Sequence, residues 1–188
     1  MNRNKFMVLS CCLALVFLLG SVSMVAGAEA EPKVGQMVPD VKFSGTITPE
    51  GSTYLGLAKQ GPFSLKDVKA PYILVEQFNT SCPHCIHQAP IMNQLYEKVE
   101  ADPQLKGKLK FIGAGQGNEE AQLKMWKAFN KVPFPLVPDP NSAFGKALNF
   151  TPYPVTVLLD KTGKILFVHI GSFESADEVI AKIKAVAK

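Results

Sequence analysis

The sequence contains little arginine, histidine or cysteine. Arg3 is the only arginine, and there are three histidines and four cysteines in 188 residues. Without Arg3 and Lys5, 18 of the 20 basic residues remain against 16 acidic ones, a balance of +2, and the lysines are scattered. Because nucleic-acid-binding proteins concentrate Lys and Arg on one face, this pattern argues against a nucleic-acid partner. No internal repeat or low-complexity segment appears, and the length suggests one domain with a short addition.

The first thirty residues have the pattern of an export signal. Arg3 and Lys5 precede an apolar stretch over residues 6–20, and small residues then form two A-x-A-like cleavage sites at 26–28 and 28–30. We therefore expect a signal peptide over residues 1–30, a mature domain over 31–188, and a periplasmic or other extracytoplasmic location. The alternative is an uncleaved N-terminal membrane anchor, because the apolar stretch and the small residues after it are together long enough to span a bilayer.

The cysteines that remain after the leader point to chemistry rather than to a structural cross-link. Cys11 and Cys12 fall in the leader, which leaves Cys82 and Cys85, separated by Pro83 and His84. An exported chain enters an oxidising compartment, where disulfides form. A disulfide that closes so small a loop adds little stability, since stabilisation grows with loop length.

Apolar patterning predicts alternating strands and helices. Residues 41–65 are expected to hold one or two short strands and loops. We expect strands over 72–78, 109–114, 135–137, 155–159 and 165–170, and helices over 85–100, 118–130, 142–148 and from Ser175 onward. This β, α, β, α, β, α, β, β, α order implies a mostly parallel sheet covered by helices, with a closing antiparallel hairpin.

Several local signals refine this prediction. Pro90 should kink the helix over 85–100, and Asn118 can cap the next helix. Ser175 and Glu178 form a predicted capping box. The buried sides of the last two long helices are expected to carry Leu123, Trp126 and Phe129, and Val179, Ile183 and Val186.

The Cys82-Pro83-His84-Cys85 segment lies between a buried strand and a helix. A thiolate is the nucleophile in disulfide exchange, and the partial positive charge of a helix N-terminus stabilises it. A second cysteine one turn later can attack the mixed disulfide and release the partner. A zinc-ligand pair is the alternative, but such a site wants four ligands, and only His84, His87 and His169 are available.

Further motifs resemble the thioredoxin superfamily, specifically its exported TlpA/ResA-like branch with the AhpC/TSA redoxin-type domain. The resemblance spans roughly residues 34–187. It implies an α/β fold of the thioredoxin type, with a central mixed β-sheet flanked by helices, an N-terminal β extension and an inserted strand–helix. The motifs are the C-x-x-C at 82–85, Pro90, the segments 63–68, 134–135 and 139–140, and the run 154–160 followed by Gly163.

The resemblance implies roles for individual residues. Cys82 would be the attacking thiol and Cys85 the resolving thiol. Pro154, with a cis bond after Tyr153, would face the cysteines and present backbone to the substrate. Tyr153 is bulky and is expected to narrow this groove, while Ser81 replaces the aromatic residue that usually precedes the first cysteine.

Two further residues are expected to tune the site. Glu76 lies six residues before Cys82, inside an apolar strand, where burial would raise its pKa and suit it to proton transfer with Cys85. The alternative is a solvated Glu76 at the sheet edge. His84, in the Pro83-His84 dipeptide, would stabilise the Cys82 thiolate and so favour an oxidant. The resembled branch, however, contains many reductases, so direction stays open.

The predicted function is an exported thiol–disulfide oxidoreductase that needs no cofactor and no metal. Its expected partners are cysteine-containing exported proteins and a membrane redox donor or acceptor. A thiol peroxidase is one alternative, although Thr80 lies two rather than three residues before Cys82, and an arginine to polarise peroxide is missing. A copper-binding protein that uses Cys82, Cys85 and His84 or His169 is a lesser alternative.

Overall fold

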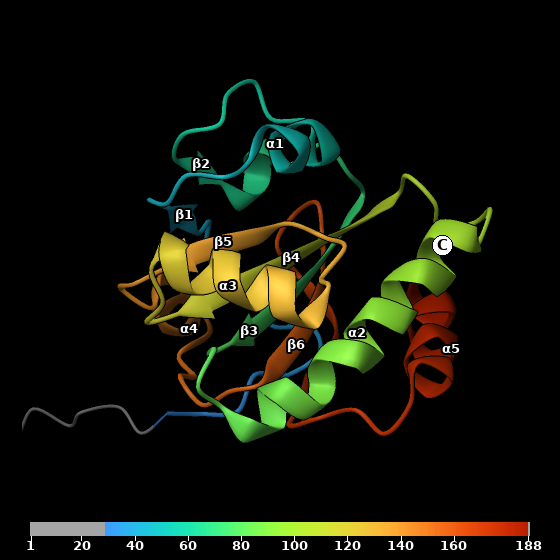
Figure 1. Ribbon diagram of the computed structural model, residues 1–188. Coiled ribbons are helices and arrows are strands. Elements are labelled where there is room, and N and C mark those ends of the chain that lie inside the picture. The colour runs from blue at the N-terminus through green and yellow to red at the C-terminus, as the bar shows by residue number, and fades with distance from the viewer. Residues whose placement is uncertain (1–28, 188) are drawn as a thin grey trace, which may run out of the picture.

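A five-stranded mixed sheet forms the centre of the computed structural model, which describes residues 29–187 (Figure 1). The strand order is β5-β4-β3-β6-β7. Strand β4 is parallel to both of its neighbours, β3 and β5. Strand β6 is antiparallel to both of its neighbours, β3 and β7. This confirms the expected mixed sheet with its closing hairpin. The strands are β3 (Tyr72–Phe78), β4 (Leu109–Gln116), β5 (Leu136–Asp139), β6 (Val155–Asp160) and β7 (Ile165–Ile170).

The central strand β3 is buried on both faces, as its apolar run predicts. Alternate residues enter two separate cores: Ile73 and Val75 belong to one, and Leu74 and Phe78 to the other. The strand therefore places any polar residue that it carries inside the protein. Glu76 is 5% exposed, so the predicted alternative of a solvated, edge-facing Glu76 is wrong.

Helices cover both faces of the sheet. On one face, α2 (Pro83–Ala101) and α5 (Ala176–Val186) lie side by side (Figure 1), and α3 (Glu120–Asn130) adds Leu123 and Trp126 to the same core. On the other face, α4 (Ala143–Leu148) packs with the N-terminal elements. The element order from β3 to α5 is the predicted one.

The N-terminal extension contains a helix that the sequence pattern did not predict. It comprises β1 (Lys42–Phe43), α1 (Pro49–Leu55), β2 (Phe63–Ser64) and the 3-10 turn Leu65–Asp67. Helix α1 contains Gly, Ser and Thr, which are weak helix formers. Its start is nevertheless capped, because the Thr48 hydroxyl accepts a hydrogen bond from Gly51 N at 3.2 Å, and its last residue, Leu55, is fully buried.

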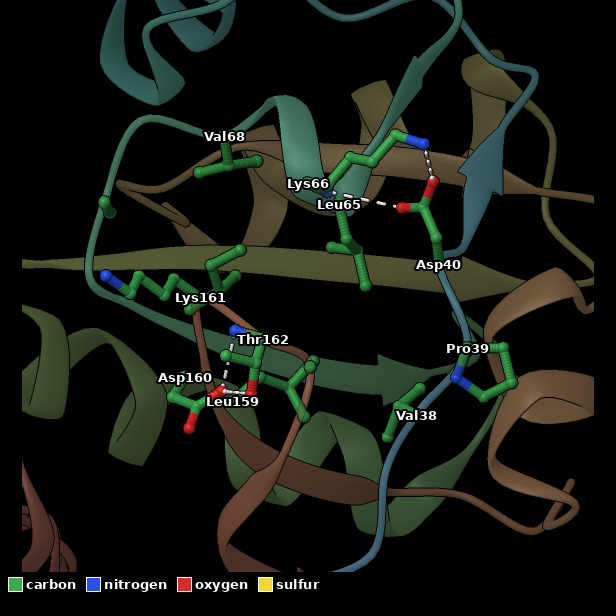
Figure 2. Close-up of a pocket in the computed structure, with 13 residues that line it drawn as sticks. Val38, Pro39, Asp40, Leu65, Lys66, Val68, Leu159, Asp160, Lys161 and Thr162 are labelled. Atoms are coloured by element: carbon green, nitrogen blue, oxygen red, sulfur yellow. Dashed lines mark hydrogen bonds and ion pairs between the residues drawn. The ribbon is translucent and has the colours of Figure 1, made fainter.

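The extension is fastened to the turn between β6 and β7 (Figure 2). Val38 N donates to the carbonyl of Gly163 at 2.9 Å. Within the extension itself, Lys66 Nζ lies 2.9 Å from Asp40 Oδ2. Gly163 has φ +88°, and a Cβ there would lie 2.7 Å from Val38 O. The turn therefore requires glycine, as predicted, both for its backbone conformation and for this close approach.

The outer faces of two helices differ from the prediction. Phe129 is 83% exposed, although it was expected beside Leu123 on the buried face. At about 100° per residue, position 129 lies about 120° around the helix from position 123. Val186, at the end of α5, is 38% exposed, while Val179 and Ile183 are buried as expected.

Helix boundaries also shifted by a few residues. Helix α2 begins at Pro83 rather than Cys85 and continues through Pro90 to Ala101. Helix α3 is capped by Glu119 and not by Asn118. Within residues 29–187, no helix is both long and apolar enough to cross a membrane. The predicted signal peptide or anchor lies almost wholly outside the described residues, as do Cys11 and Cys12.

Candidate active site

Cys82 lies where the sheet gives way to helix α2. It is the N-cap residue of α2, with Pro83 as the first helical residue, and its sulfur accepts a hydrogen bond from Cys85 N at 3.3 Å. Both cysteines are free thiols and buried, Cys82 at 8% exposure and Cys85 at 1%. A negative charge on Cys82 Sγ would therefore face an N–H group at the positive end of the helix.

Two asparagines hold the turn that leads into this helix. Asn79 Oδ1 accepts from Ser81 N at 2.9 Å, and its amide donates to the carbonyl of Gln116 at 2.8 Å. Asn118, which is buried, accepts from Thr80 N at 3.0 Å and so braces the turn instead of capping α3. The sequence analysis did not single out Asn79. Its position directly after a buried strand was a usable signal, because Asn is a common turn former.

The loop before β6 lies against Cys82. The peptide bond between Tyr153 and Pro154 is cis, as the resemblance implied. The Cys82 sulfur lies 4.0 Å from the carbonyl oxygen of Tyr153. Pro154 is buried, whereas Tyr153 is 39% exposed. Substrate binding by these two residues stays a prediction.

The carboxyl group of Glu76 is buried near Cys85. Burial raises the pKa of Glu76 to about 7, although a hydrogen bond from Gln88 Nε2 at 2.6 Å opposes the change. Burial also raises the pKa of the Cys85 thiol, and the neighbouring Cys82 and Glu76 add to this effect. A carboxyl group that titrates near neutrality, close to a thiol that ionises reluctantly, can exchange a proton with it.

Gln88 is a site residue that the sequence analysis missed. Its Nε2 donates to Glu76 and lies 3.5 Å from Thr156 Oγ1, and its Oε1 accepts from Phe173 N at 3.1 Å. The side chain is fully buried. The available signal was its position three residues after Cys85, which places it on the same helix face. Gln88 thus fixes the orientation of the Glu76 carboxyl group.

The side chain of His84 is exposed on the surface of α2. Its backbone carbonyl accepts a hydrogen bond from Ser172 Oγ at 3.0 Å, which ties the start of α2 to the loop before α5. The predicted tuning of Cys82 by His84 and Pro83 stays a prediction. His87, also exposed, decorates the helix surface as expected.

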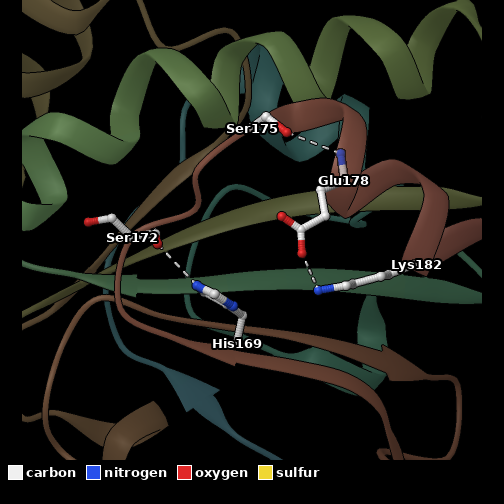
Figure 3. A network of polar contacts seen from close by, with 5 residues as sticks. All are labelled: His169, Ser172, Ser175, Glu178 and Lys182. Atoms are coloured by element: carbon white, nitrogen blue, oxygen red, sulfur yellow. Dashed lines mark hydrogen bonds and ion pairs between the residues drawn. The ribbon is translucent and has the colours of Figure 1, made fainter.

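His169 has structural contacts (Figure 3). Its Nε2 lies 3.1 Å from the carbonyl oxygen of Ser172. The centroid of its ring lies 4.6 Å from the centroid of the Phe173 ring. Half of the predicted capping box is present nearby: Ser175 Oγ accepts from Glu178 N at 3.3 Å, but the Glu178 carboxylate pairs with Lys182 instead of the cap backbone.

Across residues 29–187, no three His, Cys, Asp or Glu side chains are grouped closely enough to hold a metal ion. His169 in particular is engaged with the loop at Ser172, as described above. The copper alternative therefore gains no support from the geometry of Cys82 and its neighbours.

Comparison with known proteins gives consistent matches. The Redoxin family model matches residues 33–183. The thioredoxin-like protein YneN of Bacillus subtilis is 28% identical over 138 residues, which cover 73% of this chain and 72% of YneN. The thiol-disulfide oxidoreductase ResA of Bacillus cereus is 28% identical over 57% of this chain and 59% of its own length, so the match spans less than two thirds of that relative. The thioredoxin domain of a thiol-disulfide oxidoreductase from Bacteroides vulgatus superposes with a TM-score of 0.62 at 17% identity, covering 83% of this chain and 99% of that one.

Proposed function

This chain belongs to the Redoxin family, as a ResA-like member of the thioredoxin superfamily, and from that premise we propose that it exchanges disulfides with cysteine-containing proteins through Cys82 and Cys85. The observation that carries the proposal is the position of Cys82 at the N-cap of α2, with the N–H of Cys85 directed at its sulfur. This arrangement directs a backbone N–H donor at the sulfur that carries the negative charge when the thiol is in its reactive form.

In the reducing direction, the Cys82 thiolate attacks one sulfur of a substrate disulfide. A mixed disulfide forms, and the other substrate sulfur leaves as a thiolate. Cys85 then gives up its proton and attacks Cys82 Sγ, which releases the second substrate thiolate and leaves a Cys82–Cys85 disulfide. The substrate gains two electrons and the protein loses two. Run in reverse, the same steps oxidise a substrate dithiol.

Glu76 is proposed to take up the Cys85 proton during the resolving step. A pKa of about 7 leaves a large fraction of this carboxyl group ionised near neutral pH, so it can accept a proton and later return it. Tyr153 and Pro154 are proposed to present backbone to the substrate chain beside Cys82. Pro83 and His84 are proposed to tune the balance between the reduced and oxidised forms.

Residues 1–30 are proposed to be an export signal and residues 31–188 the working domain, in an extracytoplasmic compartment. The support is the basic start, the apolar stretch and the small residues that follow it. There the protein would meet cysteine-containing exported proteins, and a membrane redox partner would reset the cysteine pair.

The peroxidase alternative is not favoured. The curated relatives that match are a thioredoxin-like protein and thiol-disulfide oxidoreductases. The sequence also has no arginine after Arg3 that could polarise a peroxide.

Trapping of the mixed disulfide tests the proposal. In Cys85→Ser, the thiolate of Cys82 can attack but the resolving thiol is missing, so the variant should accumulate covalent adducts with a disulfide-containing protein such as insulin. Cys82→Ser is the matched control and should form none. Adducts are detected as bands on a non-reducing gel that vanish with dithiothreitol. Equal labelling of the two variants, or no adduct with either, would contradict the proposal.

A further inference from the structure

Two buried glutamines lie behind the loop that ends in Tyr153 and Pro154. Gln77 follows Glu76 on β3 and faces the opposite side of the sheet, where it is fully buried. Gln116 is the last residue of β4 and is 8% exposed. Both therefore lie at the carboxyl ends of parallel strands, next to the turn that leads to Cys82.

The amide nitrogens of these glutamines hold the backbone of the loop. Gln77 Nε2 lies 3.2, 3.2 and 2.9 Å from the carbonyl oxygens of Phe150, Thr151 and Pro152. Gln116 Nε2 donates to the same Thr151 carbonyl at 2.8 Å. These three consecutive carbonyls lie between α4 and β6, outside both elements. Side-chain amides, rather than a strand partner, supply hydrogen bonds to these carbonyls, of which the bond to Phe150 is buried and the others are partly buried.

Gly145 on α4 leaves room for this arrangement. A Cβ at that position would lie 2.8 Å from Gln116 Oε1 and 2.9 Å from Gln77 Oε1. Neither of these oxygens has a hydrogen-bond partner, although both are buried. The two amides thus leave their acceptors unpaired while their donors face the loop. An unpaired buried acceptor is costly, and in this orientation the amide nitrogens of both side chains bond to the loop.

We propose that Gln77 and Gln116 are positioning residues for disulfide exchange. By holding residues 150–152 they fix the Tyr153 carbonyl 4.0 Å from Cys82 Sγ, and so fix the backbone edge along which a substrate chain would lie. This inference rests on the proposed function. The glutamines are proposed to affect how a polypeptide disulfide docks. They are not proposed to affect the intrinsic reactivity of the Cys82 thiol.

The test replaces each amide by a side chain of similar shape without donors. Gln77→Met should lower the second-order rate constant for a peptide disulfide about tenfold, because the loop loses the donors that orient it. Alkylation of Cys82 by iodoacetamide, a small reagent that needs no docking, should stay within about twofold. If the glutamine had a purely structural role, the ratio of the peptide-exchange rate to the alkylation rate would be the same in the variant as in wild type.

Asn93 offers a matched control. Its Nδ2 donates to the carbonyl of Asn130 at 2.8 Å, and its Oδ1 is likewise buried and unpaired, but it joins α2 to the end of α3. Asn93→Leu should change neither rate by more than about twofold. Thermal unfolding of each variant shows that it is folded at the assay temperature.

Three outcomes bear on the inference. A folded Gln77→Met with an unchanged peptide rate overturns it, and so does a parallel fall in the alkylation rate. Should Gln77→Met fail to fold, Gln116→Met is the second variant, because it loses only one hydrogen bond to the loop. Its peptide-exchange rate should fall about threefold while its alkylation rate stays unchanged. If the two rates of Gln116→Met did not separate in this way, the inference would also be overturned. Wild-type protein without measurable exchange would instead defeat the proposed function.

Discussion

The buried carboxyl group of Glu76 makes a specific prediction about stability and pH. In the folded protein its pKa is about 7, against an ordinary value of 4.5. Such a difference corresponds to about 3 kcal/mol of free energy that opposes folding once the group is ionised. Glu76→Gln removes the ionisable group and keeps a side-chain oxygen that can accept the hydrogen bond from Gln88 Nε2.

The sign follows from proton binding. Between pH 4.5 and about 7, folded Glu76 retains a proton that the unfolded chain has released, so the free energy of unfolding falls as the pH rises through this window and levels off above it. Glu76→Gln should therefore be about 3 kcal/mol more stable than wild type at pH 8, and within about 1 kcal/mol of wild type near pH 4.5.

Urea unfolding of the reduced protein at several pH values measures this difference. Glu97→Gln is the control, because Glu97 is an exposed glutamate on helix α2, and its effect should stay within about 0.5 kcal/mol at each pH. If the free energies of unfolding of Glu76→Gln and wild type differed by the same amount from pH 4.5 to 8, the account of a buried carboxyl group that retains its proton would be refuted.

Three other predictions follow from the same structure. Glu76→Gln should slow the resolving step about a hundredfold, measured as the lifetime of the mixed disulfide in stopped-flow and quench experiments, and an unchanged lifetime would remove Glu76 from proton transfer. Leu95→Ala, at a fully buried position, should cost about 2–5 kcal/mol in urea unfolding, whereas Met125→Ala, at a 74% exposed position, should cost less than about 0.5 kcal/mol. Gly163→Ala should cost at least about 1 kcal/mol, because it adds a Cβ at positive φ against Val38 O; a neutral effect would show that this turn can relax.

The central sheet and the order of its helices could be predicted from sequence because β3 is a nearly continuous apolar run and the helices carry a 3.6-residue pattern. The cysteine pair could be predicted because its spacing and its position after a buried strand are local features. Burial of Glu76 followed from the same strand, since alternate residues of a two-sided strand have no solvent-exposed face.

Other features depended on contacts that spacing does not reveal. Helix α1 has weak intrinsic propensity and is stabilised by burial of Leu55, which only the packed structure shows. Gln77 bonds to residues more than seventy positions away, so nothing near it in sequence indicated its partners. Phe129 was misplaced because a spacing of six residues drifts around a helix, and its exposure shows that an apolar residue at helical spacing need not enter the core.

A redox titration of the cysteine pair tests the central claim most directly. The protein is equilibrated in glutathione buffers of varied ratio, quenched with an alkylating reagent, and the two-thiol and disulfide forms are counted by mass spectrometry. We predict one cooperative two-electron transition between Cys82 and Cys85, with a midpoint between roughly −270 mV and −120 mV. Two thiols that form separate glutathione adducts, without any Cys82–Cys85 disulfide, would contradict the account.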